Sequence, residues 1–228
     1  MKKTVVLSLG GSIIIPGDKP DHAFLKKFRE LILSYVKKGY KFAIVCGGGG
    51  LSRRYVEAAK KIRKLDDEAL DWLGISATHL NGFLLRVLFH EHSHHEVIHD
   101  YSKKPKISKK IVIGCGWKPG RSTDYDAIMI AKHLGAKTVI NLSNIEYAYT
   151  KDPRKFKNAK KIKKTTWKEF RKITGNKWSP RLSLPFDPIA SKLAQKNKTK
   201  VIIAKGTDLT NLKKILDEKE KIKGTIIE

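Results

Sequence analysis

Short apolar runs alternate with longer amphipathic segments along this chain. The runs TVVLSL at 4–9, KFAIVC at 41–46 and IVIG at 111–114 are almost wholly apolar, which predicts strands that are buried on both faces. Residues 21–38 instead place apolar side chains at intervals of three and four, which predicts a helix that begins after Asp21. By the same criteria we expect strands near 97–98, 137–142 and 201–204, and helices near 52–65, 67–90, 124–134, 187–196 and 208–216.

This alternation of buried strands and helices predicts a mostly parallel sheet with helices on both faces. We therefore expect an α/β fold of the three-layer α/β/α sandwich type. The chain has 228 residues, which suits one large domain, and we interpret 1–228 as a single domain. Ligands of such sheets bind beyond the carboxyl ends of the strands, so the turns that follow the strands are the expected place for function.

The charge of the chain is strongly positive, with 48 Lys and Arg against 22 Asp and Glu and a formal net charge of +26. Such a charge attracts nucleic acid nonspecifically, but the aromatic residues are not interleaved with the lysines as a base-stacking surface requires. We interpret the lysines as a solvated surface and expect no nucleic-acid partner. A basic module that binds nucleic acid is the least favoured of the functions that we consider for this chain.

The chain shows no sign of a membrane or secretory segment. No apolar run approaches the roughly 20 residues of a membrane-spanning helix, and the first run meets Gly10-Gly11 instead of a cleavage site. We expect a cytoplasmic protein without a membrane partner. The two cysteines, Cys46 and Cys115, lie in apolar runs, where reduced buried thiols are expected.

Three of the predicted strands end in glycine-rich turns, at 10–11, 47–50 and 114–120. Glycine lets backbone N–H groups approach an anion closely, and a helix N-terminus adds a favourable dipole. One such turn is often only a tight connection, but three at one sheet edge indicate a ligand with several phosphates. The two commonest nucleotide-binding signatures are absent, because no G-x-x-x-x-G-K-[ST] occurs and GGGGL lacks the dinucleotide spacing.

Several longer blocks carry a more specific pattern. GGGGLSR at 47–53 fits G-G-G-x-L-x-R, DWLGISATHLNG at 71–82 fits D-x-x-G-x-x-A-T-x-x-N-G, and NIEYAYTKDP at 144–153 is similar to N-V-D-G-V-Y-T-x-D-P. Shorter blocks are LGGS at 9–12, PGRSTD at 119–124, DPIASK at 187–192 and GTII at 224–227. In this order the blocks resemble the amino acid kinase superfamily, and within it the uridylate (UMP) kinases of bacteria and archaea.

The resemblance implies transfer of the ATP γ-phosphoryl group to UMP, which gives UDP for pyrimidine nucleotide synthesis. It implies that 1–140 mainly holds the phosphate acceptor and 141–228 mainly ATP. It also implies a homo-oligomer, in this family a hexamer. Mg²⁺ that arrives with ATP is the expected cofactor, and we expect no resident metal site.

The resemblance also assigns roles to single residues. Arg53 would bind phosphate oxygens, whereas its neighbour Arg54 is expected to be surface charge. Asp124 would orient the reacting groups or hold Mg²⁺ through water, and Asp71 would accept hydrogen bonds from ribose hydroxyls. The candidate catalytic residues are Asp124, Arg53 and Lys205. The candidate acceptor-binding residues are Gly47, Gly48, Asp71, Asn81, Gly120, Ser122 and Thr123. The candidate ATP-binding residues are Gly10, Gly11, Ser12, Gly49, Ser143, Asn144, Tyr149 and Asp152.

Plain structural interpretations stand beside these roles. Asp124 begins a predicted helix and would serve equally well as its N-cap. Asp71 lies in the acidic run DDEALD, which is typical of a solvated helix face. Asn81, inside a helix, would form a buried hydrogen bond, and Tyr149 would belong to the core.

Two departures from the family pattern concern the ATP side. UMP kinases commonly carry a lysine in the first strand where this chain has Ser8, and their D-G in the ATP loop is replaced by Glu146-Tyr147. The missing positive charge needs a substitute, because charge that develops during transfer must be stabilised. Lys205 follows the last buried strand and is the first candidate. Lys192 is the second, and a merely solvated lysine is the competing interpretation.

A histidine-rich segment, HEHSHH at 90–95 with His99 nearby, suggests zinc at first sight. Structural zinc sites usually draw their ligands from two separated segments, and no cysteine pair is available as a partner. We therefore expect a solvated helix end and loop here.

Two other functions within the superfamily stay open. An isopentenyl phosphate kinase would carry a histidine near its substrate phosphate, and no G-x-H follows the glycine turn in this chain. A non-catalytic homologue that binds nucleotide or oxyanions, like a molybdate storage protein, would account for Ser8 and for the histidines.

Overall fold

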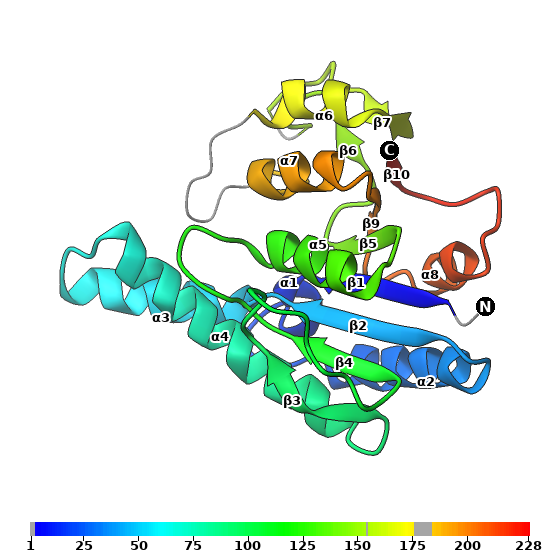
Figure 1. Ribbon diagram of the computed structural model, residues 1–228. Coiled ribbons are helices and arrows are strands. Elements are labelled where there is room, and N and C mark those ends of the chain that lie inside the picture. Colours follow the sequence, from blue (N-terminus) through cyan, green and yellow to red (C-terminus); the bar gives the residue numbers. More distant parts are fainter. Residues whose placement is uncertain (1–2, 154, 176–183) are drawn as a thin grey trace.

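A computed structural model describes residues 3–153, 155–175 and 184–228, which include a central eight-stranded sheet (Figure 1). The strands of this sheet are β1 (Thr4–Leu9), β2 (Lys41–Cys46), β3 (Ser93–Ile98), β4 (Ile111–Gly114), β5 (Thr138–Ser143), β8 (Lys164–Thr165), β9 (Lys200–Lys205) and β10 (Thr225–Ile227). Their order is β3-β4-β2-β1-β5-β9-β10-β8. All pairs from β3 to β9 are parallel and β10 is antiparallel to β9, so the predicted mostly parallel sheet is confirmed.

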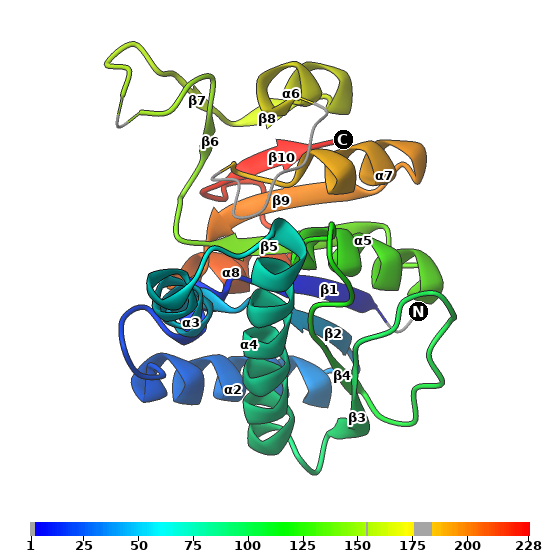
Figure 2. The ribbon, with the colours of Figure 1, turned by 90° about the vertical axis from the view of Figure 1, so that its left-hand side faces the viewer.

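Helices cover both faces of the sheet, and each face has its own core. Apolar residues of α2, α4 and α8 pack against side chains such as Leu7 on one face, and those of α5, α6 and α7 pack against side chains such as Val6 on the other. Figure 2 faces α4, with α2 and α5 behind it. The predicted three-layer sandwich is thus confirmed. The helices are α1 (Gly11–Ile14), α2 (His22–Lys37), α3 (Gly49–Ile62), α4 (Asp67–Leu88), α5 (Thr123–Leu134), α6 (Trp167–Thr174), α7 (Pro188–Lys196) and α8 (Leu209–Leu216).

The alternation of side chains along β1 places one polar residue beneath α5. Leu7 and Leu9 belong to the core on the α2 face, whereas Val6 belongs to the core on the α5 face. Ser8 follows the direction of Val6, because side chains two residues apart in a strand share a face. Its hydroxyl donates to Asp124 Oδ1 at 2.9 Å, so the first strand and α5 are joined by a polar contact.

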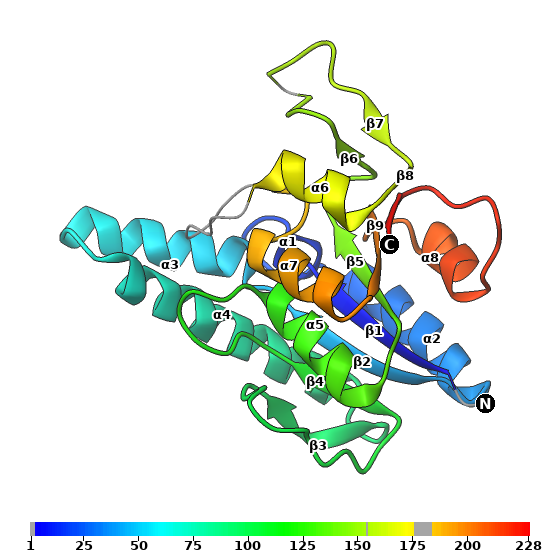
Figure 3. The same ribbon diagram turned by 45° about the horizontal axis from the view of Figure 1, so that its top comes forward.

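A small two-stranded sheet lies apart from the main one, formed by β6 (Ala148–Tyr149) and β7 (Lys161–Ile162), which Figure 3 shows at the top. Thr225 Oγ1 accepts a hydrogen bond from the Ala148 backbone at 2.8 Å and thereby ties β6 to β10. Both cysteines are free and buried, as expected. Within the described residues we find no helix that is both long and apolar enough for a membrane span.

Among the element boundaries that differ from the sequence-based expectation, two concern the glycine turn and the histidines. Helix α3 begins at Gly49 and not near residue 52, because the end of the glycine turn forms the first turn of the helix. Strand β3 spans Ser93–Ile98 and includes histidines that were expected in a helix end and loop. Apolar and polar residues do not alternate regularly along β3, so hydrophobic periodicity does not reveal this strand.

Candidate active site

The first two glycine turns touch at the carboxyl ends of β1 and β2. The Gly47 amide donates to Leu9 O at 3.0 Å, and a Cβ on Gly11 would lie only 2.5 Å from the Gly47 carbonyl carbon. Asn81 on α4 donates to Gly47 O at 2.8 Å and to Gly48 O at 3.3 Å. Asn81 is buried, and these two hydrogen bonds hold the glycine turn in place. They agree with the structural interpretation, in which Asn81 forms buried hydrogen bonds.

A cavity of about 290 Å³ opens beside this turn. It brings together residues that lie far apart in the sequence, from the turn after β2, from α4 and from the N-terminus of α5. The predicted site residues that line it are Gly47, Gly48, Asp71, Ser122, Thr123 and Asp124. Other lining residues include Ser52, Thr78, Gly116, Arg121 and Asp187.

Two side chains fix the loop between β4 and α5 beside this cavity. Asp71 is half-buried, and its Oδ2 accepts from the Gly120 amide at 2.9 Å, so Asp71 faces the loop between β4 and α5. Ser122 is the N-cap of α5, because its hydroxyl accepts from Tyr125 N at 3.2 Å. Asp124 is therefore not the cap of this helix, and the structural alternative for Asp124 is wrong.

Asp124 is held by hydrogen bonds on both carboxylate oxygens. Oδ1 accepts from Ser8 Oγ at 2.9 Å and from Asn141 Nδ2 at 2.6 Å, and Oδ2 lies 3.4 Å from the Asp187 amide. The pKa of Asp124 is raised from 3.8 to about 7, chiefly because the surrounding protein removes water from the carboxylate. The nearby charge of Asp187 also raises it, and the bonds from Ser8 and Asn141 oppose the shift.

Arg121 and Asp187 also line the cavity, and Asp126 interacts electrostatically with both of them and with Asp124. The sequence analysis named none of the three as a site residue. Asp126 is fully buried and accepts from the Trp117 amide at 3.2 Å, and burial raises its pKa well above the usual range. Asp187 caps α7 through Ala190 N at 2.6 Å, and burial raises its pKa as well. Arg121 lines the cavity, and its Nε is buried without a hydrogen-bond partner among the described residues. The position of Arg121 between Gly120 and Ser122 was the available signal.

The two arginines of α3 have different surroundings. Arg54 donates from Nη1 to Gly17 O at 2.9 Å and to Asp18 Oδ1 at 2.8 Å, so it fastens α3 to the loop before α2. Arg53 is exposed and lies outside the lining of the cavity. Arg54 is thus a surface charge with partners in that loop, and the role of Arg53 stays a prediction.

Part of the predicted ATP side gathers at the same sheet edge. The Gly10 amide donates to Leu142 O at 2.8 Å, and Ser143 at the end of β5 pairs in register with Lys205 of β9. The Gly206 amide donates to Ser143 O at 2.7 Å. Helix α1 begins with Gly11 and Ser12, and helix α3 begins with Gly49, at this same edge. Asn144 directly follows Ser143. Tyr149 lies on β6 and Asp152 follows that strand, and neither residue lines the cavity.

The residues that depart from the family pattern have structural partners. Glu146 lies 3.7 Å from the Lys223 ammonium group, and Tyr147 is buried with Lys161 5.2 Å from its ring centre. Both therefore fasten the loop between β5 and β6 to its surroundings. Their side chains replace the small, flexible pair that the family pattern has there.

A sequence model of the amino acid kinase family matches residues 3–205. The chain belongs to the amino acid kinase family. Curated uridylate kinases from Pyrococcus abyssi and Methanococcus vannielii are 33% and 32% identical to it, over 98% of this chain and 99% and 98% of their own lengths. The crystal structure of uridylate kinase from Archaeoglobus fulgidus is similar with a TM-score of 0.82 at 28% identity, and the match covers 100% of both chains. A UMP kinase from Bacillus anthracis, 22% identical with a TM-score of 0.77, has the same fold over 99% of this chain and 96% of its own.

The raised pKa of Asp124 makes the stability of this amino acid kinase depend on pH. The carboxyl has a pKa of about 7 in the folded chain and an ordinary value of 3.8, so its contribution to stability is complete below about pH 4 and is lost as the pH rises through about 7. Asp124→Asn carries no such charge. We expect its melting temperature, measured without nucleotide, to exceed that of the wild type by several degrees at pH 8, and the difference to shrink toward about pH 4.

Asp100→Asn is the matched control, because Asp100 is exposed and a hydrogen bond from Ser102 lowers its pKa. This variant should not gain stability at pH 8. A melting-temperature difference for Asp124→Asn that stays constant across the pH range would show that the carboxylate is not strained by burial.

Proposed function

We propose that this chain is a UMP kinase that transfers the γ-phosphoryl group of ATP to UMP, giving UDP and ADP in the cytoplasm. In the transfer, a phosphate oxygen of UMP forms a bond to the γ-phosphorus as the bond from that phosphorus to the bridging oxygen of ADP breaks. The observation that carries the proposal is the near full-length similarity to proteins named uridylate kinase. The cavity beside the glycine turns supports it, because the 71–82 block forms one wall.

The cavity has the groups that a nucleoside monophosphate needs. The Gly48 amide would donate to the acceptor phosphate and the guanidinium of Arg121 would neutralise its charge, since charge-assisted hydrogen bonds to phosphate are among the strongest. Asp71 would accept hydrogen bonds from the ribose, and the Thr123 hydroxyl would donate to the phosphate. These contacts would bring two anions together against their repulsion, which is the main task in phosphoryl transfer.

The donor set of the cavity fits Mg²⁺, which prefers oxygen ligands and usually uses one or two carboxylates together with phosphates and waters. Asp124 and Asp187 supply two carboxylates that line it, and burial is the main cause of the raised pKa of each. A cation would stabilise their ionised forms in place of the lost water. When bound with ATP, Mg²⁺ would neutralise negative charge on the phosphates. Ser8 and Asn141 would keep Asp124 oriented meanwhile.

We place ATP mainly on residues 141–228 and the acceptor mainly on 1–140. Gly10, Ser143 and Lys205 converge at the carboxyl ends of β1, β5 and β9, next to the acceptor cavity. Gly11, Ser12 and Gly49 belong to the crossing of the glycine turns between the two sides. The transferring group would therefore pass across the ends of β1 and β5.

The direct test is to incubate the full chain with Mg·ATP and, in turn, UMP, CMP, AMP and isopentenyl phosphate, and to measure ADP. We expect ADP formation that depends on UMP and on Mg²⁺.

Arg53→Ala should lower kcat/KM for UMP by about ten- to a hundredfold if Arg53 makes a charge-assisted phosphate contact. Arg63→Ala, at the exposed end of the same helix, is the control.

Two outcomes of the substrate panel would contradict the assignment as a UMP kinase. One is equal turnover with all four acceptors, and the other is nucleotide binding without turnover, which would favour the non-catalytic homologue.

Lys205 is our candidate for the charge that Ser8 does not supply. It ends β9 beside Ser143, at the edge where the ATP phosphates are proposed to lie. Lys205→Met should lower kcat by about a hundredfold, the usual scale for loss of one electrostatic stabiliser, whereas Lys192→Met, exposed on α7, should not. Adding Ser8→Lys to Lys205→Met should restore part of the rate. It should also move the acidic limb of the pH profile to lower pH, because the new ammonium would lie beside Asp124. Unchanged kinetics in Lys205→Met would remove this proposal.

We also propose that the chain forms a homo-oligomer, a hexamer by its resemblance to the family. The exposed face of α4 supports self-association, because Leu80, Phe83 and Val87 are 60%, 53% and 60% exposed in a chain whose surface is otherwise highly charged. Exposed apolar stripes of this kind mark interaction surfaces. Phe83→Glu should lower the mass measured by light scattering, and Ile173→Glu, on the distant α6, should not. A monomeric wild type would contradict this proposal.

A further inference from the structure

The histidine-rich segment lies on β3, which forms one edge of the sheet. A cavity of about 560 Å³ runs along this strand and is separate in its lining from the candidate active site. It is lined by the strand from His94 onward and by the loop up to Ser108. Because β3 pairs on one side only, its other side is open to ligands.

A bulge in β3 brings two histidines onto the same side. Ser93 pairs with Ile111 and Val97 with Ile113, so four steps along β3 oppose two steps along β4. Neighbouring side chains in a regular strand point to opposite faces, whereas the rings of His94 and His95 have centroids only 4.3 Å apart. Bulges of this kind redirect side chains and are frequent at sheet edges and functional sites.

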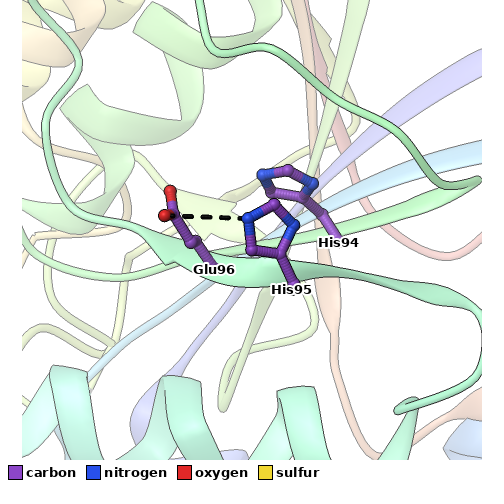
Figure 4. Close-up of side chains that lie close together, drawn as sticks. All are labelled: His94, His95 and Glu96. Atoms are coloured by element: carbon purple, nitrogen blue, oxygen red, sulfur yellow. Dashed lines mark ion pairs between the residues drawn. The ribbon is translucent and has the colours of Figure 1, made fainter.

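Glu96 completes a set of three possible metal ligands (Figure 4). One nitrogen from each imidazole and one carboxylate oxygen all lie within 4.8 Å of one another, and His95 Nε2 is 3.7 Å from Glu96 Oε1. Ligand atoms around a tetrahedral zinc ion lie about 3.4 Å apart, given bonds of about 2.0–2.1 Å. His95 and Glu96 are exposed, so small rotations of these two side chains would close the set around an ion.

His94 is anchored in the way that metal-binding histidines are. It is only 4% exposed, and its Nδ1 lies 3.1 Å from Ser108 Oγ on the neighbouring loop. A ring that donates its Nδ1 proton to this hydroxyl presents Nε2 as a free ligand, and such outer contacts fix both the tautomer and the orientation. A buried, oriented histidine is thus placed beside two adaptable ligands.

Simple ion pairing does not explain this arrangement. The side chains of His95 and Glu96 are 73% and 72% exposed, and a surface pair of that kind contributes little to stability. It also gives no reason for a buried imidazole 4.3 Å from the His95 ring. The expectation of a solvated helix end was based on the usual supply of zinc ligands from two separated segments, and the periodicity of the sequence did not indicate the bulge.

We propose that His94, His95 and Glu96 bind a divalent transition metal ion, with Zn²⁺ the fitting ion and a fourth position open to the cavity. Imidazole with carboxylate suits zinc and its neighbours in the transition series, and three protein ligands with one open position are usual for accessible zinc sites. Lys103, Lys104 and Lys106 line the same cavity, so an anion or water would complete the coordination. Their positive charge also lowers the affinity for a cation.

The test uses the full chain, freed of metal with a chelator and without nucleotide, and titrates Co²⁺ as a spectroscopic probe. We expect visible absorption bands of low-symmetry Co²⁺ that saturate near one equivalent and disappear when Zn²⁺ is added. His95→Ala and Glu96→Gln should each weaken binding at least tenfold, and Ser108→Ala about tenfold, on the scale of lost ligand contacts and outer contacts. His90→Ala, an exposed histidine outside the set, is the matched control.

Two further readouts decide the interpretation. Zn²⁺ should raise the melting temperature of the wild type and of His90→Ala, but not that of His95→Ala, whose exposed side chain can be removed without disturbing the fold. Absence of the visible bands in the wild type would overturn the proposal. Equal losses in His90→Ala and His95→Ala would overturn it too, because they would indicate scattered binding to surface histidines.

Discussion

The crossing of two glycine turns is the constraint on which the rest of this site depends. A Cβ on Gly47 would lie 2.8 Å from the Gly11 amide nitrogen, and Gly49 has a φ of +62°, a conformation that side chains disfavour. Only glycine, which has no side chain, fits where the two turns cross. As a result the ends of β1 and β2, the start of α3 and the Asn81 side chain of α4 meet within hydrogen-bonding distance, and the cavity forms where they meet.

Carboxylates that have lost much of their contact with water are the second organising feature, and they oppose stability. Asp124, Asp126 and Asp187 all have raised pKa values, because each has lost water without gaining a fully compensating positive charge. Arg121 is the nearest source of compensation, since its charge lowers the pKa values of Asp126 and Asp187. The packing of the surrounding fold keeps these carboxylates in place in spite of that cost.

The sequence allowed the layers, the parallel sheet and the meeting of the glycine turns at one sheet edge to be predicted, because these depend on periodicity and on local glycine patterns. The block at 71–82 identified Asp71, and PGRSTD identified Ser122 to Asp124, all of which line the cavity. Asp187 was missed as a lining residue and the burial of Asp126 was not expected, because both depend on the packing of α5 against α7, which no local pattern reports.

Other details required the three-dimensional arrangement for similar reasons. Arg54 resembled surface charge because its partners Gly17 and Asp18 lie in a loop more than thirty residues away in the sequence. The bulge in β3 changes which side chains share a face, so a rule based on alternation cannot locate the strand or place its histidines. Sequence motifs located residues best where the backbone of the glycine turns itself forms part of the candidate site.

The irregular edge strand has one more consequence, for solubility. Six parallel strands in a row present unpaired backbone groups where the sheet stops, and such edges can add strands from other molecules and aggregate. At one border the bulged β3 carries the polar triplet of His94, His95 and Glu96, and at the other β8 is only Lys164–Thr165. A kinked strand with charged side chains and a two-residue strand are both poor templates for further pairing. The borders of the sheet thereby protect a strongly apolar interior from polymerisation through its strands.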